Sequence, residues 1–331
     1  MRITRETLIR IAKETAQKRA LSDPELVAAY LTGSLRTDNP FLGNATDVDI
    51  VFVHAVETKV RREIIPLTPE IDLDIVHNPR SDYDKPKILR VHPWLGPELY
   101  DPLPLYGTQH FFEFVQAGVR DKYNEPASVL TRSRNLAENA RQAWSGLQLS
   151  QASGPELLLA YLASIHLAAN AVALLTGGPL AERRFLLQFP ARAVAAGQPD
   201  LAAKLLGLLG ADQVEAATLT GFLPEWEKAF IEAANNPTVE RNIAVPRLGY
   251  YKLAFESMLA SEMPQAVVWP LILTWTQSVS ALPPIWAEHW FSACKMLGLE
   301  GDALEKKLAG LDHFLDTLEE KLENVAAGQS L

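Results

Sequence analysis

The segment Leu31–Val53, LTGSLRTDNPFLGNATDVDIVFV, decides the fold of the first part of the chain. An apolar run leads into a turn at Gly33 and Ser34, and a second apolar run begins at Asp47 and Asp49. Side chains alternate faces along a strand, so these two aspartates are expected on one face with Cα atoms about 6 to 7 Å apart. Carboxylates held that close repel each other, which favours a shared divalent cation.

The turn itself has features that suit a phosphate group. Gly33 allows a ligand to approach the backbone closely, and Ser34 adds a hydroxyl group. Arg36 follows two residues later, where its guanidinium group can reach a triphosphate or can simply be exposed. Gly-Ser is also a common turn and Asp-Val-Asp also occurs at solvated strand ends, so the separate pieces leave a purely structural interpretation open.

A second acidic strand follows within the first 80 residues. The run EIDLDIV starts at Glu70 and places Asp72 and Asp74 on one face, with apolar residues on the other. One of these two aspartates is enough to complete a triad with the first pair, and the sequence does not choose between them. Glu70 is a more remote candidate.

The order of these pieces resembles the nucleotidyltransferase superfamily, whose palm is like that of DNA polymerase beta. The resemblance implies one or two Mg²⁺ ions, an NTP substrate with ATP favoured, and transfer of an NMP group to an acceptor hydroxyl. The implied metal ligands and catalytic residues are Asp47, Asp49, Asp72 and Asp74, and the implied nucleotide-binding residues are Gly33, Ser34 and Arg36.

From about residue 128 the composition shifts to Ala, Leu, Glu and Gln with helical periodicity. We therefore predict an α+β chain, in which a palm domain with a mixed sheet and flanking helices (1–126) precedes an all-α helical bundle (127–331). The phrase LLTGGPLAERRFLLQFP resembles the helical C-terminal domain of kanamycin nucleotidyltransferase and its relatives. That resemblance implies that the bundle helps to bind the acceptor.

Composition narrows the class of protein. The 331 residues are 48% hydrophobic and 21% charged, without 18 uninterrupted apolar residues, so we expect a cytoplasmic protein with no membrane span. The single cysteine, Cys294, excludes an intramolecular disulfide. A net charge of −9 counts against a long nucleic-acid substrate. The resemblance to kanamycin nucleotidyltransferase, together with this acidic balance, implies a small, cationic acceptor such as an aminoglycoside.

Several alternatives stay open at this stage. The acceptor is either a small molecule or the end of a protein or tRNA, and a catalytically silent nucleotide-binding scaffold is a further possibility. The leucines of residues 304–325 form a seam that packs within the chain or joins two chains as a homodimer. Residues 55–65 are expected to form a short helix before Pro66, and His54 is expected at the surface.

Overall fold

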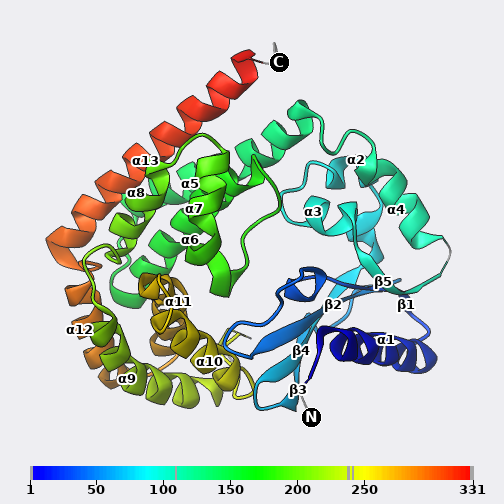
Figure 1. The fold of residues 1–331 in the computed structure, drawn as a ribbon, viewed down its shortest axis with the longest axis horizontal. Coiled ribbons are helices and arrows are strands. Elements are labelled where there is room, and N and C mark those ends of the chain that lie inside the picture. Colours follow the sequence, from blue (N-terminus) through cyan, green and yellow to red (C-terminus); the bar gives the residue numbers. More distant parts are fainter. Residues whose placement is uncertain (1–2, 109, 237–238, 241, 329–331) are drawn as a thin grey trace. The chain divides into compact units, whose positions relative to one another are not determined.

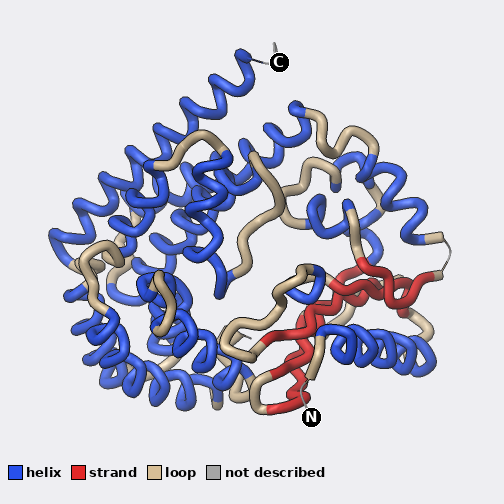
Figure 2. The backbone as a smooth tube through the Cα atoms, in the orientation of Figure 1, coloured by secondary structure: helices blue, strands red, loops and turns tan. Residues whose placement is uncertain are grey.

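The computed structural model describes residues 3–108, 110–236, 239–240 and 242–328. The chain divides into two compact units, Met1–Glu125 with Gly249–Ala254, and Pro126–Leu248 with Phe255–Leu331. Every strand of the described residues belongs to the first unit, and the second is helical (Figures 1 and 2). The predicted α+β class, a mixed sheet with helices followed by a helical region, is therefore confirmed.

Among the described residues up to Glu125, the first unit contains a sheet, four α-helices and two short 3₁₀ helices. In chain order these elements are α1 (Arg5–Ser22), β1 (Leu26–Leu31), η1 (Ser34–Arg36), β2 (Thr46–His54), β3 (Arg62–Thr68), β4 (Ile71–Pro79), η2 (Arg80–Tyr83), α2 (Pro86–Leu89), α3 (Leu95–Tyr100), β5 (Leu103–Gly107) and α4 (Phe111–Arg120).

The five strands found in the described part of the chain form one sheet in the order β3-β4-β2-β1-β5. The central strands β2 and β4 are parallel, and the other neighbours are antiparallel. Because β2 and β4 run in the same direction, their N-terminal halves lie at one end of the sheet. Both predicted acidic pairs are in those halves.

Helix α1 covers one face of the sheet. It is capped by Thr4, the residue before its first turn, whose side chain accepts a hydrogen bond from the Thr7 amide. Its apolar stripe, Leu8, Ala12 and Ala16, is fully buried against that face. The inward side chains of the strands are Leu26, Ala29, Leu31, Val48, Ile50, Phe52, Ile71, Leu73 and Ile75.

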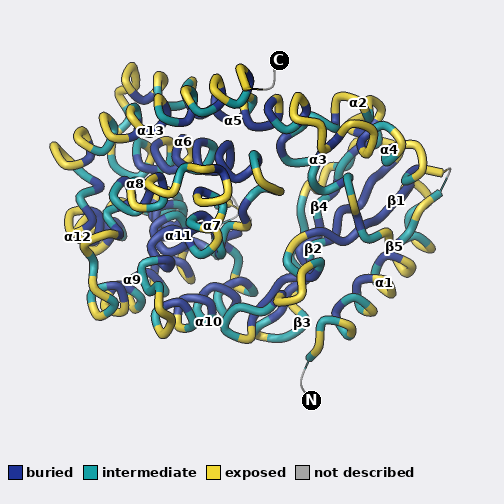
Figure 3. Tube along the Cα trace, turned by 45° about the horizontal axis from the view of Figure 1, so that its top comes forward, coloured by how far each residue is buried: buried dark blue, intermediate teal, exposed yellow. Residues whose placement is uncertain are grey.

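Helices α3 and α4 cover the other face. Leu99 of α3 and Val115 of α4 are buried in a second cluster. This cluster includes Tyr30, Val51 and other side chains of β1 and β2 on the face opposite α1. The two central strands are accordingly among the most deeply buried parts of the unit (Figure 3). Asp47 and Asp49 lie on this same face of the sheet. The helices cover its other end, from Val51 to the C-terminal end of β2.

The prediction of a short helix over residues 55–65 is wrong. Residues 55–61 form no helix, and Arg62 begins the edge strand β3. Ile64 and Ile65 favour a strand, and Pro66 is tolerated there because an edge strand needs no amide donor on its outer side.

The expected surface position of His54 is also wrong, since this side chain is 3% exposed. Its Nε2 lies 2.8 Å from Nδ1 of His77, whose Nε2 lies 2.7 Å from a carboxylate oxygen of Glu63. Nδ1 of His54 faces Asp23 at 3.3 Å, and Arg19 pairs with Glu63 at 3.2 Å. Burial lowers the pKa of both imidazoles. This buried network ties the end of α1 to the ends of β2 and β4.

The second unit consists of helices joined by short loops and 3₁₀ turns. The helices are α5 (Pro126–Leu149), α6 (Gly154–Leu174), α7 (Phe185–Ala195), α8 (Asp200–Leu209), α9 (Ala216–Ala234), α10 (Arg247–Leu259), α11 (Val268–Ser280), α12 (Glu288–Met296) and α13 (Gly301–Gly328), and residues 249–254 of α10 group with the first unit.

The leucine seam of the C-terminal helix packs within the chain. Leu311, Leu315 and Leu318 of α13 are buried, and Arg141 of α5 pairs with acidic side chains of α13, Asp312 among them. Packing within the unit accounts for this seam, and the homodimer stays a prediction.

Helix α6 is long and apolar enough to cross a membrane by length and composition alone. Of its most apolar window, 67% is buried within the structure, as in the core helix of a globular protein. The Ser164 hydroxyl of α6 donates to the Ala140 carbonyl of α5, and Ser133 of α5 donates to the Ala171 carbonyl of α6. These reciprocal bonds join α5 and α6 to each other within the helical unit.

Candidate functional site

The parallel pairing of β2 with β4 brings the predicted acidic residues together. Asp47 lies opposite Asp72, and Asp49 lies opposite Asp74. Paired residues of neighbouring strands project to the same side, so all four aspartates share one face of the sheet. The intervening Val48 projects to the other face, into the core beneath α1.

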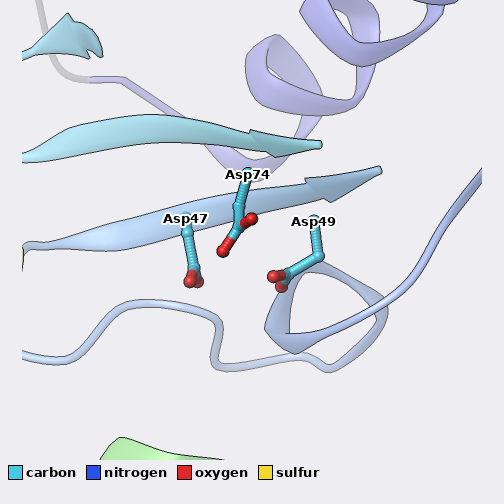
Figure 4. Close-up of side chains that lie close together, drawn as sticks. All are labelled: Asp47, Asp49 and Asp74. Atoms are coloured by element: carbon cyan, nitrogen blue, oxygen red, sulfur yellow. The ribbon is translucent and has the colours of Figure 1, made fainter. Parts of the chain in front are cut away.

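Three of the four carboxylates converge. Asp47, Asp49 and Asp74 each offer an oxygen atom, and these atoms all lie within 4.8 Å of one another (Figure 4). Asp47 is 6% exposed and Asp74 is 3% exposed. Carboxylates this close and this buried repel each other strongly in a medium of low dielectric constant. Oxygen ligands from two adjacent strands therefore fit a hard divalent cation.

Asp72 lies outside this group of three. It is fully buried, at 0% exposure, on the same face of the sheet as the group. The sequence left open whether Asp72 or Asp74 completes the triad, and the geometry places Asp74 with the first pair.

Asp74 also has a partner that the sequence did not indicate. Arg62 of β3 donates from Nε to Oδ1 of Asp74 at 2.7 Å and from Nη2 to Oδ2 at 2.5 Å. This two-pronged ion pair fixes the plane of the carboxylate. It was missed because residues 55–65 were expected to be helical, whereas β3 pairs with β4 directly beside Asp74.

The Gly33 turn lies against the same group. Gly33 has a φ of +67°, and a β-carbon added to it would lie 1.7 Å from Oδ2 of Asp49. The amide of Thr32 donates to the Asp49 carbonyl at 2.9 Å, which fixes the turn to β2. Only glycine allows this approach.

Ser34 begins the three-residue 3₁₀ helix η1. Its hydroxyl lies 3.0 Å from the hydroxyl of Thr46, the first residue of β2. Its carbonyl accepts from the Thr37 amide at 2.9 Å. The turn is thus anchored to the strand that carries Asp47 and Asp49.

Arg36 lies at the end of η1, and its side chain is 26% exposed. Its Nη2 lies 3.5 Å from Oδ2 of Asp101. It also acts electrostatically on Glu98 of α3, a carboxyl whose pKa is raised by burial to about 7 and held down in part by Tyr30 and Arg36. Glu98 was missed because it lies in a proline-rich segment that gave no firm expectation, and only the fold brings it to the turn.

A cavity of about 470 Å³ lies elsewhere in the first unit. It is lined by Tyr83 and Asp84 near η2 and by Phe111, Phe114 and Val115 of α4, together with Arg80 and His110. No aspartate of the converging group lines it. The acidic group is thus separate from this cavity.

Comparisons with known proteins give little beyond the geometry. The chain matches no protein-family profile and no curated protein. A nucleotidyltransferase-like protein from Exiguobacterium sibiricum 255-15, solved at 1.90 Å, matches 95% of this chain and 91% of its own, at 11% identity and a TM-score of 0.30. A likeness this distant carries no argument about activity.

Proposed function

We propose that this chain is a divalent-metal-dependent nucleotidyltransferase, with a palm formed by residues 1–126. The observation that carries the proposal is the convergence of Asp47, Asp49 and Asp74 within 4.8 Å beside the Gly33 turn. The order of these motifs, which resembles the superfamily, supports the same activity.

Asp47, Asp49 and Asp74 would hold the metal, with Mg²⁺ as the first choice because all the ligands are carboxylate oxygens. One or two such ions supply charge neutralisation at the phosphates of the nucleotide. Asp72, buried beside the group, would act in support. Arg62 keeps the Asp74 carboxylate in a fixed orientation through its two hydrogen bonds.

The nucleotide would bind with its phosphates at the turn. Gly33 leaves room beside Asp49, Ser34 offers a hydroxyl group and Arg36 offers a guanidinium group. In the proposed reaction the acceptor oxygen forms a bond to the α-phosphorus of an NTP, the bond from that phosphorus to the bridging oxygen breaks, and pyrophosphate leaves. The proton of the acceptor hydroxyl passes to solvent. Positioning and charge stabilisation carry such a transfer without a covalent nucleophile.

We propose a small, cationic acceptor, aminoglycoside-like in chemistry, and a cytoplasmic location. A net charge of −9 and a cluster of carboxylates attract cations and repel polyanions. The sequence of the helical unit, Pro126–Leu248 with Phe255–Leu331, resembles the helical C-terminal domain of kanamycin nucleotidyltransferase. By analogy, this unit would contribute to acceptor binding.

A second candidate, a nucleotide-binding scaffold without turnover, is favoured by one observation. Arg62 already balances the charge of Asp74, so the acidic group is partly compensated without a cation. A scaffold and an enzyme differ in one measurable property, the release of pyrophosphate.

A transfer assay tests the proposal. The chain is incubated with Mg²⁺, each α-labelled NTP in turn and a panel of aminoglycosides, and label in the acceptor and released pyrophosphate are measured. We expect transfer with the wild type, a loss of at least about a hundredfold in Asp49→Asn because charge stabilisation is the main catalytic contribution, and unchanged transfer in Asp82→Asn, which removes the same charge at an exposed position of the same unit. Nucleotide binding without transfer to any acceptor, protein and tRNA included, would favour the scaffold.

A further inference from the structure

The cavity of about 470 Å³ in the first unit lies where η2 meets the first residues of α4. Its volume falls in the range of about 300 to 1,000 Å³ that is typical of sites for small molecules. The aspartates of the acidic group do not line it. A ligand of this cavity is therefore a different molecule from the metal and the nucleotide proposed above.

The floor of the cavity is apolar and held in place. Tyr83, Phe111 and Val115 line it with buried side chains, and the rings of Tyr83 and Phe111 meet edge to face with their centroids 5.4 Å apart. The Tyr83 hydroxyl accepts a hydrogen bond from Nδ2 of Asn78 at 2.9 Å and lies 3.0 Å from the hydroxyl of Tyr30. Rings fixed in this way lose little freedom when a ligand enters.

The two walls of the cavity are also fixed relative to each other. A β-carbon added to Gly118 of α4 would clash with Pro86, the first residue of α2. The backbone of α4 therefore packs directly on α2, two residues after Asp84 on the opposite wall. This close approach keeps the distance between the walls constant.

Phe114 stands at the rim of the cavity. Its side chain is 55% exposed, although it follows Phe111 by one helical turn and lies on the same face of α4. A large apolar side chain in water beside an apolar floor gains buried area when an apolar group enters the cavity. Three aromatic rings around one space favour a planar, aromatic group, because such rings pack well edge to face or offset.

The rim also carries charges of both signs. Arg80 and the exposed Asp84 line the cavity from η2 and its C-terminal end, and His110 lines it from the start of α4. A guanidinium group binds a carboxylate through two hydrogen bonds, and a carboxylate binds an ammonium group. A neutral ligand would cover both charges without replacing their hydration, which costs free energy. A ligand with one negative and one positive group replaces both.

We propose that this cavity binds an α-amino acid with an aromatic side chain. The ring of the amino acid lies among Tyr83, Phe111 and Phe114, its carboxylate faces Arg80 and its ammonium group faces Asp84. Binding is reversible and no covalent bond changes. It requires neither a metal nor a nucleotide, so the inference stands independently of the proposed function.

Calorimetric titration without Mg²⁺ tests the proposal. L-phenylalanine and L-tryptophan are titrated into the full chain, each beside an analogue that lacks the ammonium group (3-phenylpropanoate, indole-3-propanoate) and one that lacks the carboxylate (phenethylamine, tryptamine). We expect saturable binding of at least one amino acid. Each of its analogues should bind about tenfold more weakly, since each loses hydrogen bonds between charged groups.

Three variants assign the contacts. In Asp84→Asn the amino acid should bind no more tightly than its analogue without the ammonium group, and in Arg80→Gln no more tightly than its analogue without the carboxylate. A purely structural role of these side chains would not change the selectivity in this way. Phe114→Ala should weaken binding about fivefold, because one ring contact is lost. Asp84 and Phe114 are exposed, so these two variants keep the test decisive if Arg80→Gln does not fold.

Two controls match these changes. Asp82→Asn removes an exposed carboxylate of η2, and Ile88→Ala removes an apolar side chain that is 59% exposed; neither residue lines the cavity. Both should bind the amino acid as the wild type does. The proposal is overturned if neither amino acid binds saturably, if an analogue binds the wild type as tightly as its amino acid, or if Asp84→Asn keeps the selectivity of the wild type. Binding of guanosine, a neutral planar molecule, in place of both amino acids would overturn it as well.

Discussion

A β-carbon on Gly33 would lie 1.7 Å from Oδ2 of Asp49, which is about half of an ordinary contact distance. The turn and the carboxylate are thus packed against each other without room for a side chain. This relationship explains why the glycine of the turn and the second aspartate of β2 belong to one site.

Gly33→Ala tests this packing. The backbone at Gly33, with φ +67° and ψ −157°, is almost exclusive to glycine, so an alanine there costs about 1 to 3 kcal/mol in addition to the displacement of Asp49. We expect lower stability in urea and loss of divalent-cation binding. The control is Gly146→Ala in α5, where no atom lies within 4 Å of the added carbon. It should raise stability by about 0.5 to 1 kcal/mol and leave cation binding unchanged. Normal cation binding in Gly33→Ala would contradict the packing described here.

Arg62→Met tests the partner of Asp74. Removing one partner of a fully buried ion pair costs about 3 to 5 kcal/mol, and we expect about 2 kcal/mol here because the Arg62 side chain is 34% exposed. The loss of its positive charge should also strengthen cation binding, so Mg²⁺ or Mn²⁺ should raise the melting temperature of this variant more than that of the wild type.

The matched control is the neighbouring Arg61→Met, whose pair with Glu57 is exposed on both sides. It should change stability by less than about 0.5 kcal/mol. An equal shift of melting temperature by the cation in Arg62→Met and in the wild type would show that Asp74 takes no part in a metal site.

The buried histidines predict how stability depends on pH. Burial lowers the pKa of His54 and His77 in the folded chain. Below about pH 6.5 these two histidines therefore bind more protons in the unfolded chain than in the folded chain. The stability that comes from these neutral rings is therefore complete above pH 6.5 and is lost as the pH falls through their folded pKa values. Urea unfolding at several pH values should show this decline. His54→Gln should flatten it, and His289→Gln, at an exposed histidine, should not. An unchanged slope in His54→Gln would contradict the assignment.

The sequence predicts those parts of the site whose residues lie close together along the chain, and it does not predict contacts between distant segments. Asp47 and Asp49 lie on one strand face by local alternation, and the Gly33 turn precedes them closely, so the pattern was enough. The choice of Asp74 over Asp72 depends on the register of two parallel strands, which no local pattern encodes.

The missed contacts are long-range, whereas the helix expected over residues 55–65 was a local error, since Ile64 and Ile65 favour a strand. The sequence treated His54 as an exposed strand end because nothing nearby indicates that Asp23 and His77 meet it. The edge strand β3 was mistaken for a helix, and the Arg62 ion pair was lost with it. Glu98 reaches the turn only because β5 pairs with β1.

The central claim is that the three converging aspartates make a metal-dependent nucleotide site, and one calorimetric titration tests it most directly. Each NTP is titrated with and without Mg²⁺ into the wild type, Asp49→Asn and the control Asp82→Asn. We predict that one NTP binds the wild type and the control only with Mg²⁺ present and does not bind Asp49→Asn. Equal binding to the wild type and Asp49→Asn, or binding that is independent of Mg²⁺, would contradict the account.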